Sequence, residues 1–179
     1  MTSEFSSNHF ELFGLPVAYA VAAEALSARY RELQQAAHPD RVAGASDRER
    51  RLSMQRATQI NEAYQVLKDP LRRARYLLHL NGVEWDDEHN TFSDPAFLME
   101  QMERREALDE VRDRDDPLAA VGEILQQVQA DIGALTAEVG QAFAAGSLEA
   151  ARGCVGRLQF LYKLRAEAEA LEADLEDEL

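Results

Sequence analysis

The sequence contains little of what several large classes of protein require. Its 179 residues include a single cysteine, Cys154, which excludes a disulfide within the chain and any zinc site built from several cysteines. No apolar run approaches the roughly 20 residues of a membrane-spanning helix. The first four residues also lack the basic start and apolar stretch of a secretory signal. We therefore expect a cytoplasmic protein that does not act on a membrane.

Positive charge is scarce, and the shortage lies in one half of the chain. The net charge is −14. Residues 1–81 hold 11 basic and 9 acidic side chains, whereas residues 82–179 hold 8 basic and 24 acidic ones. Such an acidic chain is not a general nucleic-acid binder. The uneven charge indicates two modules with electrostatically different partners.

Motifs of catalysis and of metal or cofactor binding are also missing. The four histidines, His9, His38, His79 and His89, offer no pair at the i, i+4 spacing that metal-binding helices use. The sequence has neither a glycine-rich phosphate loop nor a nucleophile motif. We therefore expect a protein that is not an enzyme and needs no metal or cofactor.

A short motif, His38-Pro39-Asp40, lies between two segments with helical periodicity. Apolar residues recur every three or four positions from Leu26 to Ala37 and again from Ala57 to Leu67, which predicts two amphipathic helices. Pro39 restricts the residue before it to extended geometry and so ends the first helix. Asp47 is placed to cap the second. We expect an antiparallel helical hairpin with the motif in its loop.

Two shorter helices are predicted on either side of this hairpin. Asn8 as a cap and Gly14 as a terminator bound the first of them. Asp69-Pro70 starts the other, which ends at Asn81-Gly82. The first helix of the hairpin itself begins poorly, because Ala22 stands where a capping side chain is expected.

Residues 93–179 show helical periodicity throughout, and no strand pattern occurs in the chain. Ser93-Asp94-Pro95 starts a helix that ends near Asp113, Asp116-Pro117 starts a second, and Gly146-Ser147 separates it from a third. The second helix carries four heptads, a pattern typical of coiled-coil packing, at Leu118, Val121, Leu125, Val128, Ile132, Leu135, Val139 and Ala142. The short turn makes the last two helices antiparallel neighbours, so we expect a three-helix bundle.

The helical hairpin with His-Pro-Asp in its loop resembles the J domain of DnaJ-type co-chaperones over residues 8–81. In that family the loop and the helix before it engage the ATPase of a DnaK-like chaperone and trigger ATP hydrolysis. The resemblance implies that Asp40 pairs with an arginine of the chaperone and that nearby arginines meet an acidic surface. The implied chaperone-binding residues are Arg29, Arg31, His38, Pro39, Asp40 and Arg41.

A plainer interpretation treats the motif only as the stop of a helix in a small helical domain. Two departures from the J-domain pattern, Ala37 where an aromatic residue is usual and Arg41 where lysine is usual, concern the affinity for the chaperone and do not favour this alternative. On this interpretation the protein is an acidic helical adaptor without a chaperone partner. The substitution Asp40→Asn would then change no activity.

Further segments resemble the HscB family, the J-type co-chaperones of iron–sulfur cluster assembly. The Gly/Phe-rich linker and the cysteine-rich zinc module of general J proteins are absent. The resemblance implies two partners, the DnaK-like chaperone HscA and the cluster scaffold IscU, and a J protein for a different client is the open alternative. The similar segments follow one another along nearly the whole chain, at residues 10–16, 61–64, 70–78, 97–101, 105–110 and 157–164.

In HscB proteins the C-terminal bundle binds the scaffold through an apolar and acidic patch on its first helix, joined by an aromatic residue from its last. Leu98 and Met102 are one helical turn apart here, and the neighbouring carboxylates favour a basic partner. The alternative is that these two side chains face the bundle core and that Phe160, which adjoins the core stripe, is partly structural. The resemblance implies a scaffold surface made of Leu98, Met99, Met102, Glu103, Glu106 and Phe160.

Together these patterns predict an all-α protein. A J domain is expected at residues 1–81, a linker at 82–92 and a three-helix client-binding domain at 93–179. The resemblance implies that the two modules form an L. We expect a co-chaperone that stimulates the ATPase of HscA and delivers IscU to it, so that iron–sulfur proteins mature.

Overall fold

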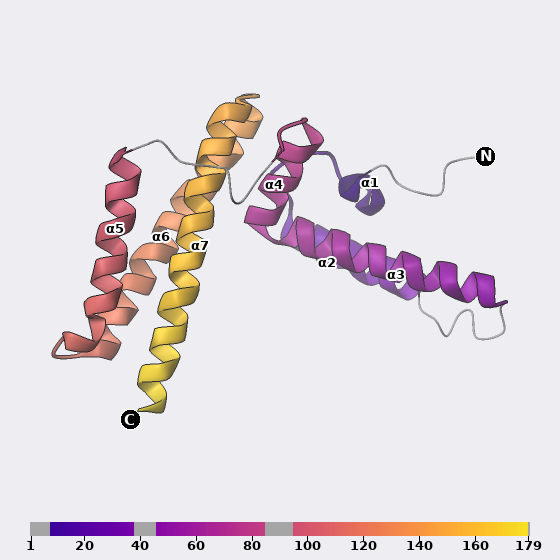
Figure 1. The fold of residues 1–179 in the computed structure, drawn as a ribbon. Coiled ribbons are helices and arrows are strands. Elements are labelled where there is room, and N and C mark those ends of the chain that lie inside the picture. The colour runs from indigo at the N-terminus through magenta and orange to yellow at the C-terminus, as the bar shows by residue number, and fades with distance from the viewer. Residues whose placement is uncertain (1–7, 38–45, 85–94, 179) are drawn as a thin grey trace. The chain divides into compact units, whose positions relative to one another are not determined.

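The computed structural model of the chain describes residues 8–37, 46–84 and 95–178. These ranges contain helices and connecting turns but no strand, so the predicted all-α class is confirmed (Figure 1). The chain divides into two units, Met1–Leu80 and Asn81–Leu179. Over the described ranges, no helix has the length and apolar character needed to cross a membrane.

The first unit is built around a helical hairpin. Helix α2 (Ala23–Ala36) packs against α3 (Asp47–Lys68), and α4 (Pro70–Leu80) follows α3 after a one-residue break. The short α1 (His9–Phe13) packs against α3 and buries Phe10 and Phe13 completely. Of the stripe predicted on α3, Ile60 and Leu67 are buried, whereas Ala57 and Tyr64 are only partly buried. Ala63, which the prediction did not include, completes the buried face.

Local capping signals set most helix ends in this unit. The side chain of Asn8 accepts a hydrogen bond from the amide of Glu11 at 3.0 Å, and Gly14 ends α1 with a φ of 65°. Asp69 accepts from the amide of Arg72 at 2.8 Å at the start of α4. As expected, Ala22 precedes α2 without any side-chain cap.

The prediction that Asp47 caps α3 is wrong, because the cap is Ser46. The Ser46 hydroxyl accepts from the amide of Glu49 at 3.4 Å, and the Glu49 carboxylate accepts from the amide of Ser46 at 2.8 Å. This reciprocal capping box satisfies two amides at once, whereas a single cap satisfies only one. Asp47 becomes the first helical residue and pairs with Arg50 at 2.8 Å.

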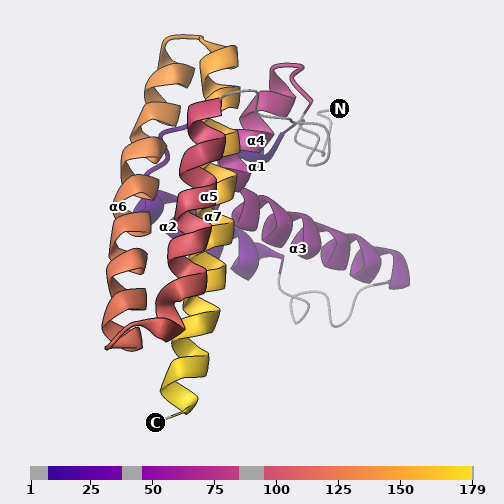
Figure 2. The same cartoon turned by 60° about the vertical axis from the view of Figure 1, so that its left-hand side comes forward.

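The second unit is a long antiparallel hairpin with one further helix beside it (Figures 1 and 2). Helices α6 (Pro117–Ala144) and α7 (Leu148–Asp177) are joined by a tight turn in which Gly146 has a φ of 69°. The predicted heptad residues form the α6 side of their interface, although Leu118 and Leu125 are only partly buried. The coiled-coil-like packing is therefore made within the chain.

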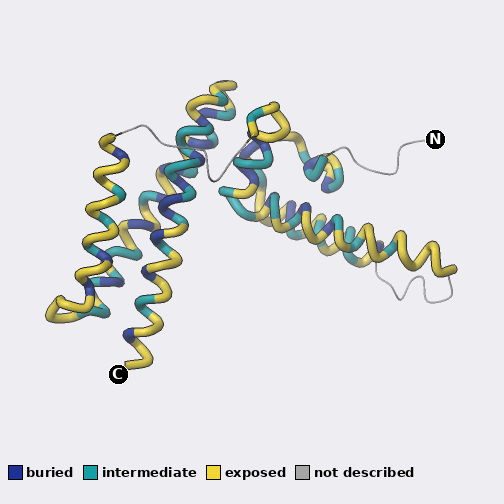
Figure 3. The backbone as a smooth tube through the Cα atoms, in the orientation of Figure 1, coloured by how far each residue is buried: buried dark blue, intermediate teal, exposed yellow. Residues whose placement is uncertain are grey.

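Helix α5 (Pro95–Asp109) differs from its neighbours in how little of it is buried. Figure 3 shows exposed residues along most of α5, whereas α7 carries buried residues along its length. Only Phe97 and Leu108 of α5 are buried. The helix does not run to Asp113 as predicted, because a 3₁₀ turn, η2 (Glu110–Asp113), replaces its end and buries Val111.

Candidate functional site

The residues implied in chaperone binding are only partly described. His38, Pro39, Asp40 and Arg41 lie outside the described residues. The residue before them, Ala37, is buried, and its carbonyl accepts a hydrogen bond from the Ser53 hydroxyl at 2.9 Å. The end of α2 is therefore fastened to α3 immediately before the motif.

An aromatic and amide cluster holds α2 against α3 further from the loop. The rings of Tyr30 and Tyr64 stack with centroids 4.0 Å apart, and the ring of Phe13 also stacks with Tyr64, with centroids 6.4 Å apart. The Tyr30 hydroxyl donates to the Asn61 side-chain oxygen at 2.7 Å, and the Gln34 amide donates to the same oxygen. These contacts fix the rotation of α2, and with it the directions of the basic side chains on its surface.

Arg29 and Arg31 are both exposed, but they leave α2 on different sides. Two positions along an α-helix turn the side-chain direction by about 200°. The guanidinium of Arg29 also forms an ion pair with the Glu32 carboxylate at 2.9 Å. Both side chains are exposed, so the pair contributes little to stability. The two arginines therefore do not form a single basic cluster on α2.

Other exposed arginines occur on the first half of α3 and escaped the sequence interpretation. Arg48, Arg50, Arg51 and Arg56 are all exposed there. The signal that could have found them is the dense basic run that begins after the helix cap. These four arginines outnumber the two carboxylates of the same half, Asp47 and Glu49, so this half of α3 carries a net positive charge even though Asp47 pairs with Arg50.

The second candidate surface lies on α5 and is outward-facing. The exposed fractions of Leu98, Met99 and Met102 are 46%, 65% and 72%, and Glu103 and Glu106 beside them are exposed as well. The alternative that Leu98 and Met102 face the bundle core is therefore wrong. We call these five residues the α5 patch.

Phe160 does not join the α5 patch at the surface. It is 8% exposed and meets Phe97 edge to face, with ring centroids 5.8 Å apart. The guanidinium of Arg157 lies over the Phe97 ring, 5.3 Å from its centroid. Phe160 thus supports α5 from the bundle side.

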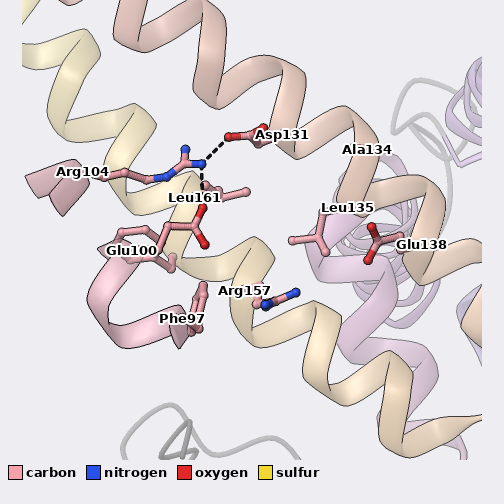
Figure 4. A pocket seen from close by; sticks show the side chains of 10 residues that line it. Phe97, Glu100, Arg104, Asp131, Ala134, Leu135, Glu138, Arg157 and Leu161 are labelled. Carbon is pink, nitrogen blue, oxygen red and sulfur yellow. Dashed lines mark hydrogen bonds and ion pairs between the residues drawn. The ribbon is translucent and has the colours of Figure 1, made fainter. Parts of the chain in front are cut away.

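A hollow of about 180 Å³ opens between α5, α6 and α7 (Figure 4). Its walls combine the Phe97 and Phe160 rings with a charged cluster centred on Arg104. Arg104 contacts Asp131 on α6 at 2.6 Å and Glu100 on α5 at 2.7 Å. Partial burial disfavours the charged guanidinium, but the hydrogen bonds and charges of both carboxylates outweigh it and raise the pKa of Arg104.

Burial is also the main cause of the pKa shifts of two further groups, neither of which belongs to a cluster of functional side chains. Burial lowers the pKa of His9, which stacks on Tyr76 with ring centroids 4.3 Å apart, and the charge of Glu62 opposes this shift. Burial and then the charge of Glu138 raise the pKa of the Cys154 thiol, which is half-buried. In the described part of the chain, no group of three or more His, Cys, Asp or Glu residues could hold a metal ion.

Comparison with known proteins matches both units. A DnaJ domain profile matches residues 8–76, and the profile described as HSCB C-terminal oligomerisation domain matches residues 93–169. The co-chaperone protein HscB homolog of Vibrio campbellii is 45% identical over 168 residues, which covers 94% of this chain and 98% of the relative. The one from Pseudoalteromonas atlantica is 45% identical over 174 residues, 95% of this chain and 99% of that relative.

Solved structures agree with these matches along most of the chain. Chaperone HscB from Vibrio cholerae superposes with a TM-score of 0.85 at 44% identity and covers 94% of this chain and 99% of its own. Human co-chaperone HscB superposes with a TM-score of 0.86 at 29% identity, covering 94% of this chain and 83% of its own.

Proposed function

This chain belongs to the HscB family of co-chaperone proteins, and from that premise we propose that it brings an iron–sulfur scaffold to a DnaK-like chaperone. The chaperone is of the HscA type and the scaffold of the IscU type. The J domain stimulates ATP hydrolysis by the chaperone while the C-terminal bundle holds the scaffold. The chain itself catalyses nothing, because the ATP is bound and hydrolysed by its partner.

On the chaperone side, His38, Pro39 and Asp40 make the triggering contact in this proposal. Asp40 pairs with an arginine of the chaperone, and Pro39 reduces the entropy lost when the loop docks. Arg29, Arg31 and Arg41 attract an acidic chaperone surface and mainly increase the association rate. The anchoring of Ala37 to Ser53 supports this, since a loop that starts from a fixed point loses less freedom on binding.

On the scaffold side, the α5 patch is the docking surface. The observation that carries this proposal is the exposure of Leu98, Met99 and Met102 together on one helix of a strongly acidic unit. Clustered apolar side chains at the surface indicate a binding site, and methionines adapt to an irregular partner. Glu103 and Glu106 then select a basic partner and set its orientation.

Joining the two modules in one chain makes the process efficient. A scaffold held by the bundle stays near the chaperone that the J domain has engaged, which raises its effective concentration well above that of free scaffold. ATP hydrolysis is thereby coupled to capture of this client, and cluster release or transfer follows.

The proposal is tested by titrating purified IscU-type scaffold into the full chain in a calorimeter. We expect saturable binding of one scaffold per chain, without nucleotide or chaperone present. Absence of binding, with chaperone stimulation retained, would assign the J domain to a different client. Absence of both activities would leave only an acidic helical adaptor.

A further inference from the structure

Helix α5 carries the α5 patch, yet little apolar contact holds it to the bundle. Of its 15 residues only Phe97 and Leu108 are buried, one near each end. Burial of an apolar face is what normally fixes a helix against its neighbours. The middle of α5, which carries most of the α5 patch, lacks such an anchor.

Arg104 occupies this gap. It lies seven residues after Phe97 and four before Leu108, so all three side chains leave α5 on the same face. Its guanidinium reaches across to α6 and contacts Asp131 at 2.6 Å, while Glu100 holds it from one turn earlier at 2.7 Å (Figure 4). The ion pair therefore ties α5 to α6 where apolar contact is missing.

The environment of this pair makes it stronger than an ordinary surface pair. The Arg104 and Asp131 side chains are 23% and 29% exposed, so water screens their attraction incompletely. By contrast, Arg105 and Glu167 are about half exposed and 3.4 Å apart. Exposed pairs of that kind contribute little.

We infer that Arg104 is a positioning residue that holds α5 at a fixed rotation against α6, so that Leu98, Met99 and Met102 face outward together. The inference rests on the proposed function, because it concerns how the scaffold-binding surface is presented. Arg104 makes this contribution from the inner face of α5, opposite the α5 patch.

Removing the guanidinium has two effects on α5. The helix is then anchored only near its ends, and the scaffold must order it on binding, which costs affinity. The Asp131 carboxylate also faces Glu100 with no cation between them, so α5 and α6 repel each other. We expect Arg104→Ala to bind the scaffold about tenfold more weakly.

The decisive set of variants keeps or reverses the same charge cluster. Arg104→Glu adds a third carboxylate and should weaken binding further than Arg104→Ala. The double variant Arg104→Glu with Asp131→Arg again has one guanidinium and two carboxylates in the cluster, but the guanidinium is now on α6. We expect its affinity for the scaffold to be within about threefold of that of the wild type. Arg112→Ala is the control, because it removes an exposed pair with Glu178 and the same unit of charge.

Calorimetric titration of scaffold is combined with amide hydrogen exchange of the free variants. The inference predicts faster exchange over residues 95–109 in Arg104→Ala, recovery in the reversed pair, and no change in the α6 and α7 cores or in chaperone stimulation without scaffold. Unchanged affinity and unchanged α5 exchange in Arg104→Ala would overturn the inference alone. Exchange that rises equally in all three helices would also overturn the inference, because Arg104 would then stabilise the whole bundle and not position α5. A wild-type protein that binds no scaffold would overturn the proposed function as well.

Discussion

Phe97 and Phe160 meet edge to face with ring centroids 5.8 Å apart, and this contact joins the start of α5 to the middle of α7. Both side chains are buried. An aromatic expected at the scaffold surface is thus part of the support beneath it. Any loss of scaffold affinity on removing Phe160 will therefore include a loss of structure.

That relationship predicts a large effect of Phe160→Ala on stability. Truncating a buried phenylalanine leaves a cavity and costs about 3–5 kcal/mol. We expect the free energy of unfolding of the second unit, measured in urea, to fall by this amount. Hydrogen exchange of the amides in the α7 core reports on this unit specifically. Met99→Ala, at an exposed position, should stay within about 0.5 kcal/mol of the wild type. If Phe160→Ala is as stable as the wild type and loses only scaffold binding, Phe160 contacts the scaffold directly and the structural role is wrong.

Met102 should behave in the opposite way. Its side chain is 72% exposed, so Met102→Ser should leave stability within about 0.5 kcal/mol. Scaffold affinity should fall about tenfold, as for a central apolar contact worth more than 1 kcal/mol. The matched control is Met54→Ser on α3, since Met54 is equally exposed at 72%. Equal scaffold binding by both variants would remove Met102 from the docking surface.

The capping box at the start of α3 gives a third prediction. Ser46→Ala should destabilise the first unit by about 1 kcal/mol, because the amide of Glu49 loses its partner. Asp47→Ala should cost about half as much or less, since it removes only an exposed pair and a favourable helix-end charge. Exchange of the buried Ile60 amide measures both. A larger effect at Asp47 would contradict the assignment of the cap.

The lowered pKa of His9 predicts how the stability of the first unit changes with pH. Its pKa is lowered in the folded protein by burial, so below its ordinary value near 6.5 the unfolded chain binds more protons than the folded one. Stability is therefore retained above that value and is lost as the pH falls toward the lower folded pKa. Glu62 opposes the effect and keeps it small.

The measurement is the melting temperature between pH 7.5 and 5. His9→Phe keeps a ring against Tyr76 but cannot titrate, so its melting temperature should fall less than that of the wild type over this range. Identical pH dependence of the two proteins would show that His9 is not the titrating group.

Helix existence and most helix ends were predictable because their signals are local. Asn8 and Asp69 cap α1 and α4 through side chains three residues from the amides they satisfy. The error at Asp47 was avoidable, since Glu49 lies three residues after Ser46 and identifies the capping box. The early end of α5 was not predictable, because it depends on burying Val111 against the rest of the bundle.

The candidate site was predictable only in part, and for a physical reason. Exposure of Leu98 and Met102 follows from which face α5 turns to the bundle, and α5 has too few apolar residues to decide this by periodicity. The contact of Arg104 with Asp131 joins residues 27 positions apart on different helices, so only the tertiary arrangement places them together. Phe160 adjoins the apolar stripe of α7, so its position in the sequence is compatible with a place in the bundle core or with a place on the scaffold surface.

The most direct test is steady-state ATP hydrolysis by the HscA-type chaperone, measured with wild type or Asp40→Asn and with or without scaffold. We predict that wild type stimulates hydrolysis, that adding scaffold raises the rate further, and that both increases disappear with Asp40→Asn. Met102→Ser should retain the first increase and lose much of the second. Stimulation that is indifferent to scaffold, or that persists in Asp40→Asn, would contradict the account.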